Sequence, residues 1–293
     1  MLYDTLVSRI PVENGWSGDQ KFRAADSTGN VYLLRISPAD RFDRKRQEFA
    51  RMEQAAALEI PMCLPLEFGS CSEGVYAIHS WINGQDAEEV IPTLSPEEQY
   101  AYGIDGGKIL KRLHTLPAPA DAPSWEARYG AKIDRKIAMY QACPLRYPGD
   151  EFFFQTIQAH RHRIHDRPQS YQHGDYHIGN MMIDQRGKLT ILDFDRDDYG
   201  DPWEEFNRIV WCAQASPRFA SGLVDGYFGG PVPMEFWYLL ALYICNNALS
   251  SLPWAVPFGQ QEIDTMLRQG QEIISWYDHP DFPVPTWYTP VSP

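Results

Sequence analysis

Three oxygen-bearing side chains in the middle of the sequence have the types and the spacing that metal-dependent phosphoryl transfer requires. Asp175 is followed five positions later by Asn180, and Asp193 comes after a short segment with a hairpin pattern. Phosphoryl transfer needs a carboxylate that orients the attacking hydroxyl group, and it needs divalent cations that bridge the phosphates. Because such cations take oxygen ligands, we expect these three side chains to share one site.

Each of these residues also has a simpler interpretation. Asp175 alone could cap a backbone amide in an ordinary turn. The ordered succession of Asp175, Asn180, Asp193 and Asp201 favours a built site, because several matching residues together outweigh any one of them. His173 is expected to brace the loop rather than to exchange protons.

The motifs around these residues resemble those of the aminoglycoside phosphotransferase and choline kinase superfamily, which shares the protein-kinase-like fold. That family has a His-Gly-Asp-x-x-x-x-Asn catalytic loop, as at residues 173–180, and a metal loop with Asp-Phe or Asp-Trp, as at residues 193–194. Gly-Asp-Pro follows, as at residues 200–202. The resemblance covers about residues 13–210 and is greatest to the aminoglycoside-phosphotransferase-like branch.

The resemblance implies a role for each matching residue. Asp175 would be the catalytic carboxylate, and Asn180 and Asp193 would be the Mg²⁺ ligands. Arg35 would contact the phosphates of the nucleotide, which is ATP or GTP. Glu48 would hold Arg35 in place by an ion pair.

Three further positions would contact the nucleotide through a loop or through the backbone. Ser17 lies within residues 14–18, where the family places a loop that covers the phosphates. The backbone of residues 79–82, including Ser80 and Ile82, would meet the edge of the adenine or guanine ring.

The sequence departs from the protein-kinase pattern at several positions. Many kinases have lysine where Arg35 stands, and a planar guanidinium does not replace an ammonium without consequence. Asp195 replaces the glycine of Asp-Phe-Gly, and Ala-Pro-Glu is missing, which argues against a protein substrate. Residues 14–18 contain only two glycines. These departures leave open a nucleotide-binding, pseudokinase-like protein without transferase activity.

The charge balance bears on the acceptor. Lys and Arg number 26 against 39 Asp and Glu, and the formal net charge is −13. Such a chain is poorly suited to nucleic acids or anionic membranes, whereas an acidic field attracts cationic small molecules. We expect a small-molecule hydroxyl acceptor, cationic and aminoglycoside-like, and hence a part in antibiotic resistance. An orphan metabolite kinase for choline, homoserine or a sugar-like compound is the alternative. The expected oligomeric state is a monomer or a weak dimer.

The elements that must position these residues form an α+β chain with a protein-kinase-like two-lobe fold. The hydrophobic pattern predicts a helix at residues 41–58 and strands at residues 20–25, 31–36, 66–69 and 75–81. Residues 1–82 would thus be a nucleotide-binding lobe, with a small antiparallel sheet and one main helix.

Residues 83–293 would form a larger, mainly helical lobe with the catalytic loop, the metal loop and the acceptor site. Ser95 followed by proline predicts a helix start. Other predicted features are helices near residues 125–141 and 152–164 and a hairpin at 181–183 and 189–192. The apolar run at residues 236–245 is too short to span a bilayer and reads as a core helix.

The cysteines and the N-terminus favour a cytoplasmic location. The five cysteines are scattered without a CxxC motif, which indicates neither a disulfide framework nor a structural zinc site. The first residues lack the basic start and apolar core of a signal peptide.

Overall fold

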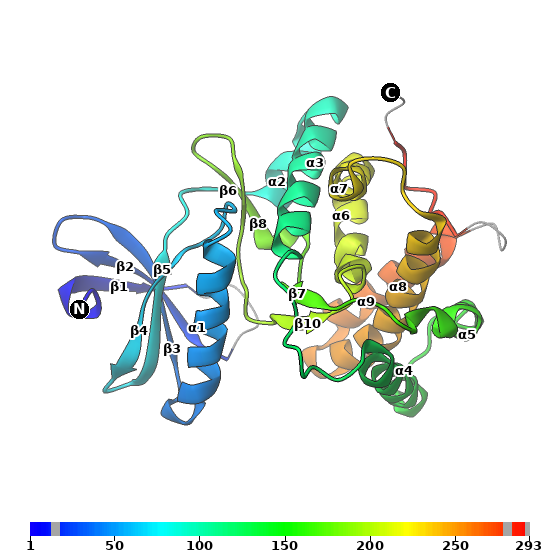
Figure 1. Cartoon of the computed structure of the whole chain (residues 1–293), viewed down its shortest axis with the longest axis horizontal. Coiled ribbons are helices and arrows are strands. Elements are labelled where there is room, and N and C mark those ends of the chain that lie inside the picture. Colours follow the sequence, from blue (N-terminus) through cyan, green and yellow to red (C-terminus); the bar gives the residue numbers. More distant parts are fainter. Residues whose placement is uncertain (13–17, 278–282, 291–293) are drawn as a thin grey trace. The chain divides into compact units, whose positions relative to one another are not determined.

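The computed structural model describes residues 1–12, 18–277 and 283–290, and the chain divides into two compact units (Figure 1). The first unit comprises Met1–Val90, His173–Asp175 and Gly179–Asp197. The second unit comprises Ile91–Gln172, Tyr176–Ile178 and Asp198–Pro293. The α+β class and the kinase-like combination of a small antiparallel sheet with a mainly helical remainder are confirmed.

The first unit is built on a five-stranded antiparallel sheet with the order β1-β2-β3-β5-β4. Its strands are β1 (Leu6–Pro11), β2 (Gln20–Asp26), β3 (Val31–Ser37), β4 (Pro65–Cys71) and β5 (Gly74–Ser80). One face of the sheet carries a buried apolar cluster of Ala24, Leu34, Ile36, Tyr76 and Ile78. The predicted strands are present, and β1 is an additional edge strand that the pattern did not predict.

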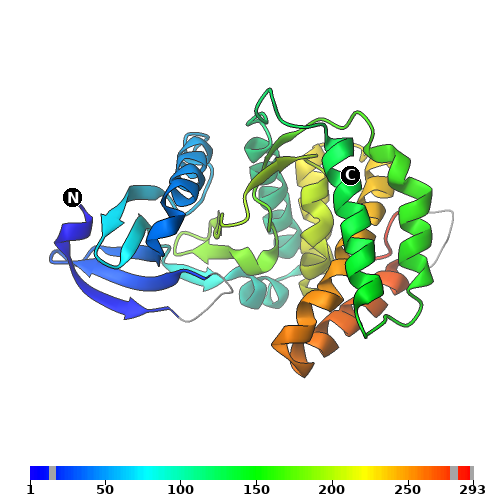
Figure 2. The ribbon, with the colours of Figure 1, turned by 90° about the horizontal axis from the view of Figure 1, so that it is seen from below.

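Helix α1 (Phe42–Ala56) covers the other face of this sheet (Figures 1 and 2). Its Phe49 ring lies 5.6 Å from the Phe68 ring and 5.9 Å from the His79 ring, measured between centroids. The short 3-10 helices η1 (Tyr3–Thr5) and η2 (Ala39–Arg41) complete this part of the chain. Successive side chains of a strand point to opposite faces of the sheet. The strand residues between those of the apolar cluster therefore face α1 and line the space beneath it.

A second, three-stranded sheet joins distant segments within the first unit. It has the order β6-β8-β9, with β6 at Gly84–Asp86, β8 at Met181–Asp184 and β9 at Leu189–Ile191. The Ile191 N–H donates to the Pro61 carbonyl at 2.9 Å, and the Cys63 N–H donates to the Ile191 carbonyl at 3.2 Å. These bonds tie the predicted hairpin to the first ninety residues. The compact units thus divide the chain differently from the expected boundary between residues 82 and 83.

The second unit is mainly helical. Its helices are α3 (Pro96–Leu113), α4 (Trp125–Ala142), α5 (Glu151–His160), α6 (Ile209–Ala215), α7 (Pro217–Phe228), α8 (Met234–Ala255) and α9 (Gln260–Trp276). The shorter elements of the chain are α2 (Ala87–Val90), η3 (Ile91–Thr93), η4 (Arg161–Ile164), β7 (Ser170–Gln172), η5 (Ile178–Asn180), β10 (Asp198–Gly200), η6 (Glu204–Arg208) and η7 (Val256–Phe258). Ser95 forms a complete capping box with Glu98, which confirms the predicted start of α3.

Helices α3 and α7 pack unusually closely because glycines face each other. A Cβ atom on Gly103 would lie 2.2 Å from the Phe219 carbonyl oxygen, and one on Gly107 would lie 2.2 Å from the Leu223 carbonyl oxygen. Gly226 on α7 is equally close to α3. Larger residues at these positions would therefore force the two helices apart.

Helix α8 provides the core of the second unit. Most of its side chains are buried, and it packs against α4, α5, α9 and η6. By length and composition alone, Met234–Phe258 is the one stretch of the described chain that could cross a membrane, but 67% of its most apolar window is buried within the protein. The predicted core helix is confirmed.

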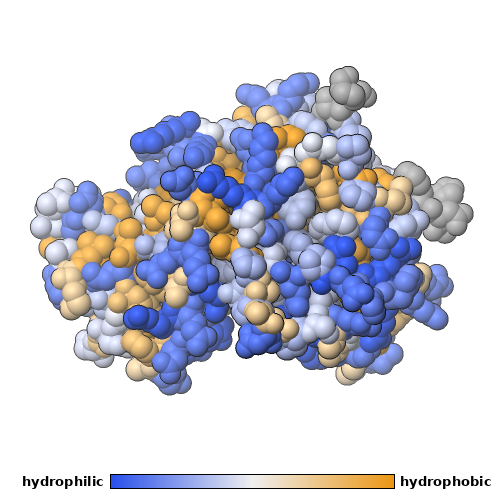
Figure 3. Space-filling model, viewed as in Figure 1, coloured by the Kyte–Doolittle hydropathy of each residue, from blue (hydrophilic) through white to orange (hydrophobic). Residues whose placement is uncertain are grey.

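The surface and the cysteines agree with the sequence-based expectations. Hydrophilic side chains predominate on the face shown in Figure 3, as a formal net charge of −13 leads one to expect. All five cysteines lie within the described ranges, and none of them forms a disulfide bond there.

Candidate active site

A cavity of about 500 Å³ lies within the first unit. Six of the predicted site residues line it, namely Arg35, Glu48, Ser80, Ile82, Asn180 and Asp193. Its apolar lining includes Leu33, Phe49, Met52, Phe68, Trp81 and Met182. A cavity that is largely apolar with a few convergent charges is typical of a small-molecule site.

The loop that carries Asp175 is fixed to the loop that carries Asp193. His173 is fully buried, and its Nε2 lies 2.7 Å from the Leu192 carbonyl oxygen. The His173 ring also contacts the ring of Phe194, with 4.5 Å between centroids. The Leu192 N–H donates to the Asn180 carbonyl at 2.9 Å. His173 therefore braces the loop, in agreement with the structural role expected for it.

Two backbone conformations in these loops are restricted. Gly174 has a φ of +82°, and a Cβ atom there would lie 1.9 Å from the Arg196 carbonyl oxygen, so only glycine fits. Asp193 has a φ of +58°, which is uncommon for a residue with a side chain and is often found at functional sites. These conformations determine where the carboxylates of Asp175 and Asp193 lie.

Asp175 and Asn180 are positioned by neighbours in the same loops. The Asn180 Nδ2 donates to the Asp175 carbonyl at 2.9 Å, and the Asp175 Oδ2 lies 3.5 Å from the Arg196 Nη1. The Asp175 N–H donates to the His173 Nδ1 at 3.3 Å. Because its Nδ2 is used in this way, the amide of Asn180 can present its oxygen to a cation.

The donors at this site fit Mg²⁺. Asn180 and Asp193 offer an amide and a carboxylate oxygen at one cavity, and Mg²⁺ characteristically takes one or two carboxylates together with substrate phosphates. Within residues 1–12, 18–277 and 283–290, no three His, Cys, Asp or Glu side chains group to hold a metal ion by themselves. A cation bound here would accordingly need further ligands, such as phosphate oxygens.

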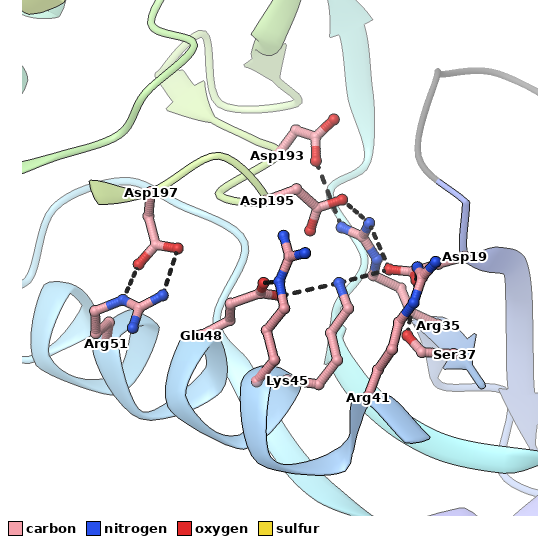
Figure 4. A network of polar contacts seen from close by, with 11 residues as sticks. Asp19, Arg35, Ser37, Arg41, Lys45, Glu48, Arg51, Asp193, Asp195 and Asp197 are labelled. Carbon is pink, nitrogen blue, oxygen red and sulfur yellow. Dashed lines mark hydrogen bonds and ion pairs between the residues drawn. The ribbon is translucent and has the colours of Figure 1, made fainter. Parts of the chain in front are cut away.

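Arg35, on β3, is the centre of a network of charged residues at this cavity (Figure 4). Its Nη2 lies 3.1 Å from the Asp19 Oδ2, and its Nη1 lies 3.4 Å from the Asp193 Oδ1. It also forms an ion pair with Asp195. The guanidinium thus links the start of β2 to the metal loop.

The predicted ion pair between Arg35 and Glu48 is wrong. Among the described residues, Glu48 pairs with Arg44 at 2.7 Å and with Lys45 at 2.9 Å. Lys45 lies one turn before Glu48 on α1 and also contacts Asp19 at 2.9 Å. Within the described part of the chain, Glu48 is therefore joined to Arg35 through Lys45 and Asp19 (Figure 4), because nearer charges satisfy both of the predicted partners.

Asp19 is a site residue that the sequence-based reasoning missed. Its side chain is 2% exposed and accepts hydrogen bonds from the Ser37 hydroxyl at 2.7 Å and the Lys45 ammonium at 2.9 Å. Burial alone would raise the pKa of Asp19, but the bonds from Lys45 and Ser37 and the charge of Arg35 lower it. In the sequence, the one signal for Asp19 was its position directly after residues 14–18, the segment with two glycines.

The end of β5 forms the wall expected to meet the nucleobase. The Ser80 N–H donates to the Leu64 carbonyl at 2.8 Å, and the Ser80 hydroxyl accepts from the Leu64 N–H at 2.8 Å. The neighbouring His79 is 5% exposed, and its Nδ1 has no hydrogen-bond partner among the described residues. Burial, with the charges of Arg35 and Lys45, lowers the pKa of His79 to about 3. The predicted contact residue Ser17 lies outside the described residues.

The model of the phosphotransferase enzyme family matches residues 8–237. The chain belongs to this family. It is accordingly a small-molecule phosphotransferase, a kinase with a hydroxyl group as acceptor.

Solved structures show the same fold as this phosphotransferase at low sequence identity. A thermostable mutant of the aminoglycoside phosphotransferase APH(4)-Ia, in a ternary complex with ADP and hygromycin B, is 16% identical with a TM-score of 0.66, over 93% of this chain and 95% of that chain. A choline/ethanolamine kinase family protein from Mesorhizobium loti is 17% identical with a TM-score of 0.64, over 93% and 90%.

A third solved structure is that of amicoumacin kinase hAmiN in complex with AMP-PNP, Ca²⁺ and Ami. It is 14% identical to this phosphotransferase with a TM-score of 0.64, over 90% of this chain and 87% of that chain. A comparison with curated proteins found no significant match. The predicted superfamily is confirmed, and at these identities the solved structures support the fold rather than a particular substrate.

Proposed function

We propose that this phosphotransferase transfers the γ-phosphate of ATP or GTP to a hydroxyl group of a small molecule, with Asp175 as the catalytic carboxylate. One observation carries the proposal. Asn180 and Asp193 line the same cavity as Arg35, and hydrogen bonds join the loops of both to the loop of Asp175. Residues that are far apart in sequence thus supply a phosphate-binding cation, metal ligands and a carboxylate.

The nucleotide would occupy the cavity of the first unit. The purine fits the apolar lining formed by Leu33, Phe49 and Trp81, and the backbone near Ser80 and Ile82 would meet its polar edge. The nucleotides in the titles of neighbouring structures, ADP and AMP-PNP, agree with this assignment.

The triphosphate would lie toward the charged end of the cavity. Arg35 would donate to phosphate oxygens, and its planar fork suits two oxygens at once. Asn180 and Asp193 would hold Mg²⁺, which when bound would neutralise part of the phosphate charge. The residues themselves contribute mainly position and electrostatic stabilisation.

Asp175 would orient the acceptor hydroxyl group and receive its proton as the new P–O bond forms. The bond from the γ-phosphorus to the bridging oxygen would break in the same transfer, and the nucleoside diphosphate would leave with that oxygen. The Asp175 Oδ2 lies 3.5 Å from the Arg196 Nη1, so the carboxylate has a cationic neighbour that helps to position it. Glu48, with no contact to Arg35 among the described residues, would support the phosphate site indirectly through Lys45.

For the acceptor, we propose an aminoglycoside-like compound, and therefore a part in antibiotic resistance. The net charge of −13 suits a polycationic acceptor. Neighbours are described with hygromycin B and with Ami. A metabolite such as choline is the alternative, since a choline/ethanolamine kinase family protein is equally similar. The five cysteines, which form no disulfide bond among the described residues, favour a cytoplasmic location.

The test is nucleotide consumption by the purified protein with Mg²⁺. ATP and GTP are supplied separately, against pools of aminoglycosides, macrolides, choline and sugar-like metabolites. Asp175→Asn is the inactive variant, and Asp121→Asn, at an exposed position of the second unit, is the matched control for loss of one carboxylate.

Stimulation by one pool in the wild type and in Asp121→Asn, but not in Asp175→Asn, supports the proposal and identifies the acceptor class. Equal turnover by Asp175→Asn would contradict the catalytic assignment. Nucleotide binding without turnover in every pool would favour the non-enzymatic alternative.

A further inference from the structure

Lys21 is a cation of the nucleotide cavity that no motif singled out. It lies on β2 directly opposite Arg35 on β3, and both residues line the cavity. Residues opposite each other in an antiparallel pair extend from the same face of the sheet, about 5 Å apart at Cβ. The ammonium of Lys21 and the guanidinium of Arg35 therefore approach the same part of the cavity.

The two other Lys or Arg side chains that line the cavity, among the described residues, are already paired. Arg35 contacts Asp19, Asp193 and Asp195, and Lys45 contacts Asp19 and Glu48 at 2.9 Å each. For the Lys21 side chain, no ion pair or hydrogen bond is found within the described part of the chain. Lys21 is thus the cation at this cavity whose charge is left for a ligand.

The surroundings of Lys21 disfavour its charged form when the cavity holds no anion. Burial lowers the pKa of Lys21, and although Asp193 and Asp19 oppose this effect, the charges of Arg35 and Lys45 lower it further. Like charges opposite each other on neighbouring strands also destabilise the pair. A polyanion near Lys21 and Arg35 would relieve both effects.

The position of Lys21 in the sheet makes a lysine unexpected for structural reasons alone. β2 is an interior strand, paired with β1 and β3, and its inner face lies against the cavity. Interior strand positions usually carry β-branched or aromatic residues. A residue that breaks a local rule without a structural gain often serves a functional site.

We propose that Lys21 is a second phosphate-binding residue, which binds the triphosphate of the nucleotide together with Arg35. This inference rests on the proposed function, since it requires that a nucleotide occupies the cavity. The ligand group is a nucleoside triphosphate, and Lys21 contributes through its phosphates and not through its base or sugar.

The experiment compares the wild type with Lys21→Met, Lys21→Arg and Lys188→Met. Lys188 is exposed on the turn between β8 and β9 in the same unit, so its variant removes an equal charge away from the cavity. Calorimetric titration measures the dissociation constants of AMP-PNP and GMP-PNP with Mg²⁺, and of the matching nucleoside. Thermal unfolding checks that each variant is folded, and Lys21→Gln replaces Lys21→Met if the latter is not.

We expect Lys21→Met to weaken binding of the triphosphate analogue about tenfold, the effect of one lost hydrogen bond to a charged group. Binding of the nucleoside should stay unchanged in that variant. Lys21→Arg should retain most of the affinity, because a guanidinium also donates to phosphate. Lys188→Met should bind as the wild type does.

Unchanged binding of the triphosphate analogue by Lys21→Met would overturn the inference. An equal loss for the nucleoside, or a loss in Lys21→Arg as large as that in Lys21→Met, would overturn it as well. If the wild type binds neither AMP-PNP nor GMP-PNP, the proposed function itself fails and the inference fails with it. The wild-type titration therefore separates the two failures.

Discussion

Two arginine–aspartate networks, one in each unit, have similar chemistry and different surroundings. In the first unit, Arg35 contacts Asp193 and Asp195 at a cavity, and these carboxylate side chains are 35% and 22% exposed. In the second unit, Arg167 holds Asp201 by hydrogen bonds of 2.7 and 3.0 Å, and the side chain of Asp201 is 0% exposed. One network is open to a ligand, and the other is closed.

The closed network is satisfied by protein groups alone. Asp201 also accepts hydrogen bonds from the Tyr243 hydroxyl at 2.6 Å and the Trp203 N–H at 3.0 Å, and the guanidinium of Arg167 stacks on the Trp203 ring at 3.9 Å. The hydrogen bonds of Asp201 therefore hold the start of η6 in place. We infer that a buried charge serves the fold where protein groups fill its surroundings, and serves ligand binding where a cavity remains.

The largest effect is expected at the open network. Replacing Asp193 with Asn removes the carboxylate proposed to bind Mg²⁺, which should lower turnover about 10³-fold or more, since a metal ion contributes several kcal/mol of transition-state stabilisation. The fold should remain, because the carboxylate faces the cavity. Turnover kinetics and thermal unfolding of Asp193→Asn measure both quantities. A folded Asp193→Asn variant with wild-type turnover would contradict the assignment of the open network to ligand binding.

The opposite result is expected at the closed network. Asp201→Ala leaves the half-buried Arg167 without its fully buried counter-charge, which should destabilise the protein by about 3 kcal/mol. Denaturant unfolding of the wild type and the variant gives this free energy. Asp198→Ala, which removes an exposed carboxylate paired with Arg128, is the control and should change stability little. A stable Asp201→Ala protein with reduced turnover would place Asp201 in the catalytic machinery instead.

The buried His79 in the wall of the cavity should make the free energy of unfolding depend on pH. Burial holds the pKa of His79 at about 3, whereas an unfolded chain binds a proton near pH 6.5. Between these values only the unfolded state is protonated, so stability falls as the pH decreases from 7. The loss to pH 5 is about 2 kcal/mol. His79→Phe should lose less stability over this range in denaturant titrations, and parallel curves for both proteins would contradict the assignment.

The smallest effect on activity is expected when the arginine of each network is replaced with lysine, which keeps the charge and loses the planar guanidinium. Arg35→Lys keeps the charge but cannot contact three carboxylates and a phosphate at once, so kcat/KM should fall about tenfold. Arg167→Lys should instead lower the unfolding temperature and leave kcat/KM of the folded enzyme unchanged. Steady-state kinetics and thermal unfolding of the two variants make the comparison directly. If Arg35→Lys and Arg167→Lys changed kcat/KM and the unfolding temperature by the same amounts, the proposed difference between the open and the closed network would be contradicted.

Much of the local structure was predictable from the sequence. Ser95, Pro96 and Glu98 encode the start of α3 within four residues, and the turn after Asp184 encodes the β8–β9 hairpin. β1 was missed because it is an irregular edge strand. Its Val7 and Ile10 are 68% and 56% exposed, so no alternation of apolar and polar residues marks it.

The candidate site was only partly predictable. Arg35, Asn180 and Asp193 were identified from the family motifs, and they do line one cavity. Lys21 and Asp19 were missed because neither belongs to a motif, and their importance depends on the strand pairing and on α1. The close contact of Gly103 with α7 was also overlooked, although a Gly-x-x-x-Gly spacing on both helices could have signalled it.

By itself, the sequence determined the family, the start of α3, the hairpin and the residue types proposed to bind the metal ion. The helix start and the hairpin depend on groups within a few positions of one another, and the family is marked by the spacing of residues within its motifs. Only the tertiary structure decided which charges pair between distant segments, as in the contacts of Arg35 with Asp19 and Asp193. An ion pair forms within about 4 Å, and the segments of Asp19, Arg35 and Asp193 reach that distance only when the sheet, α1 and the metal loop have folded together.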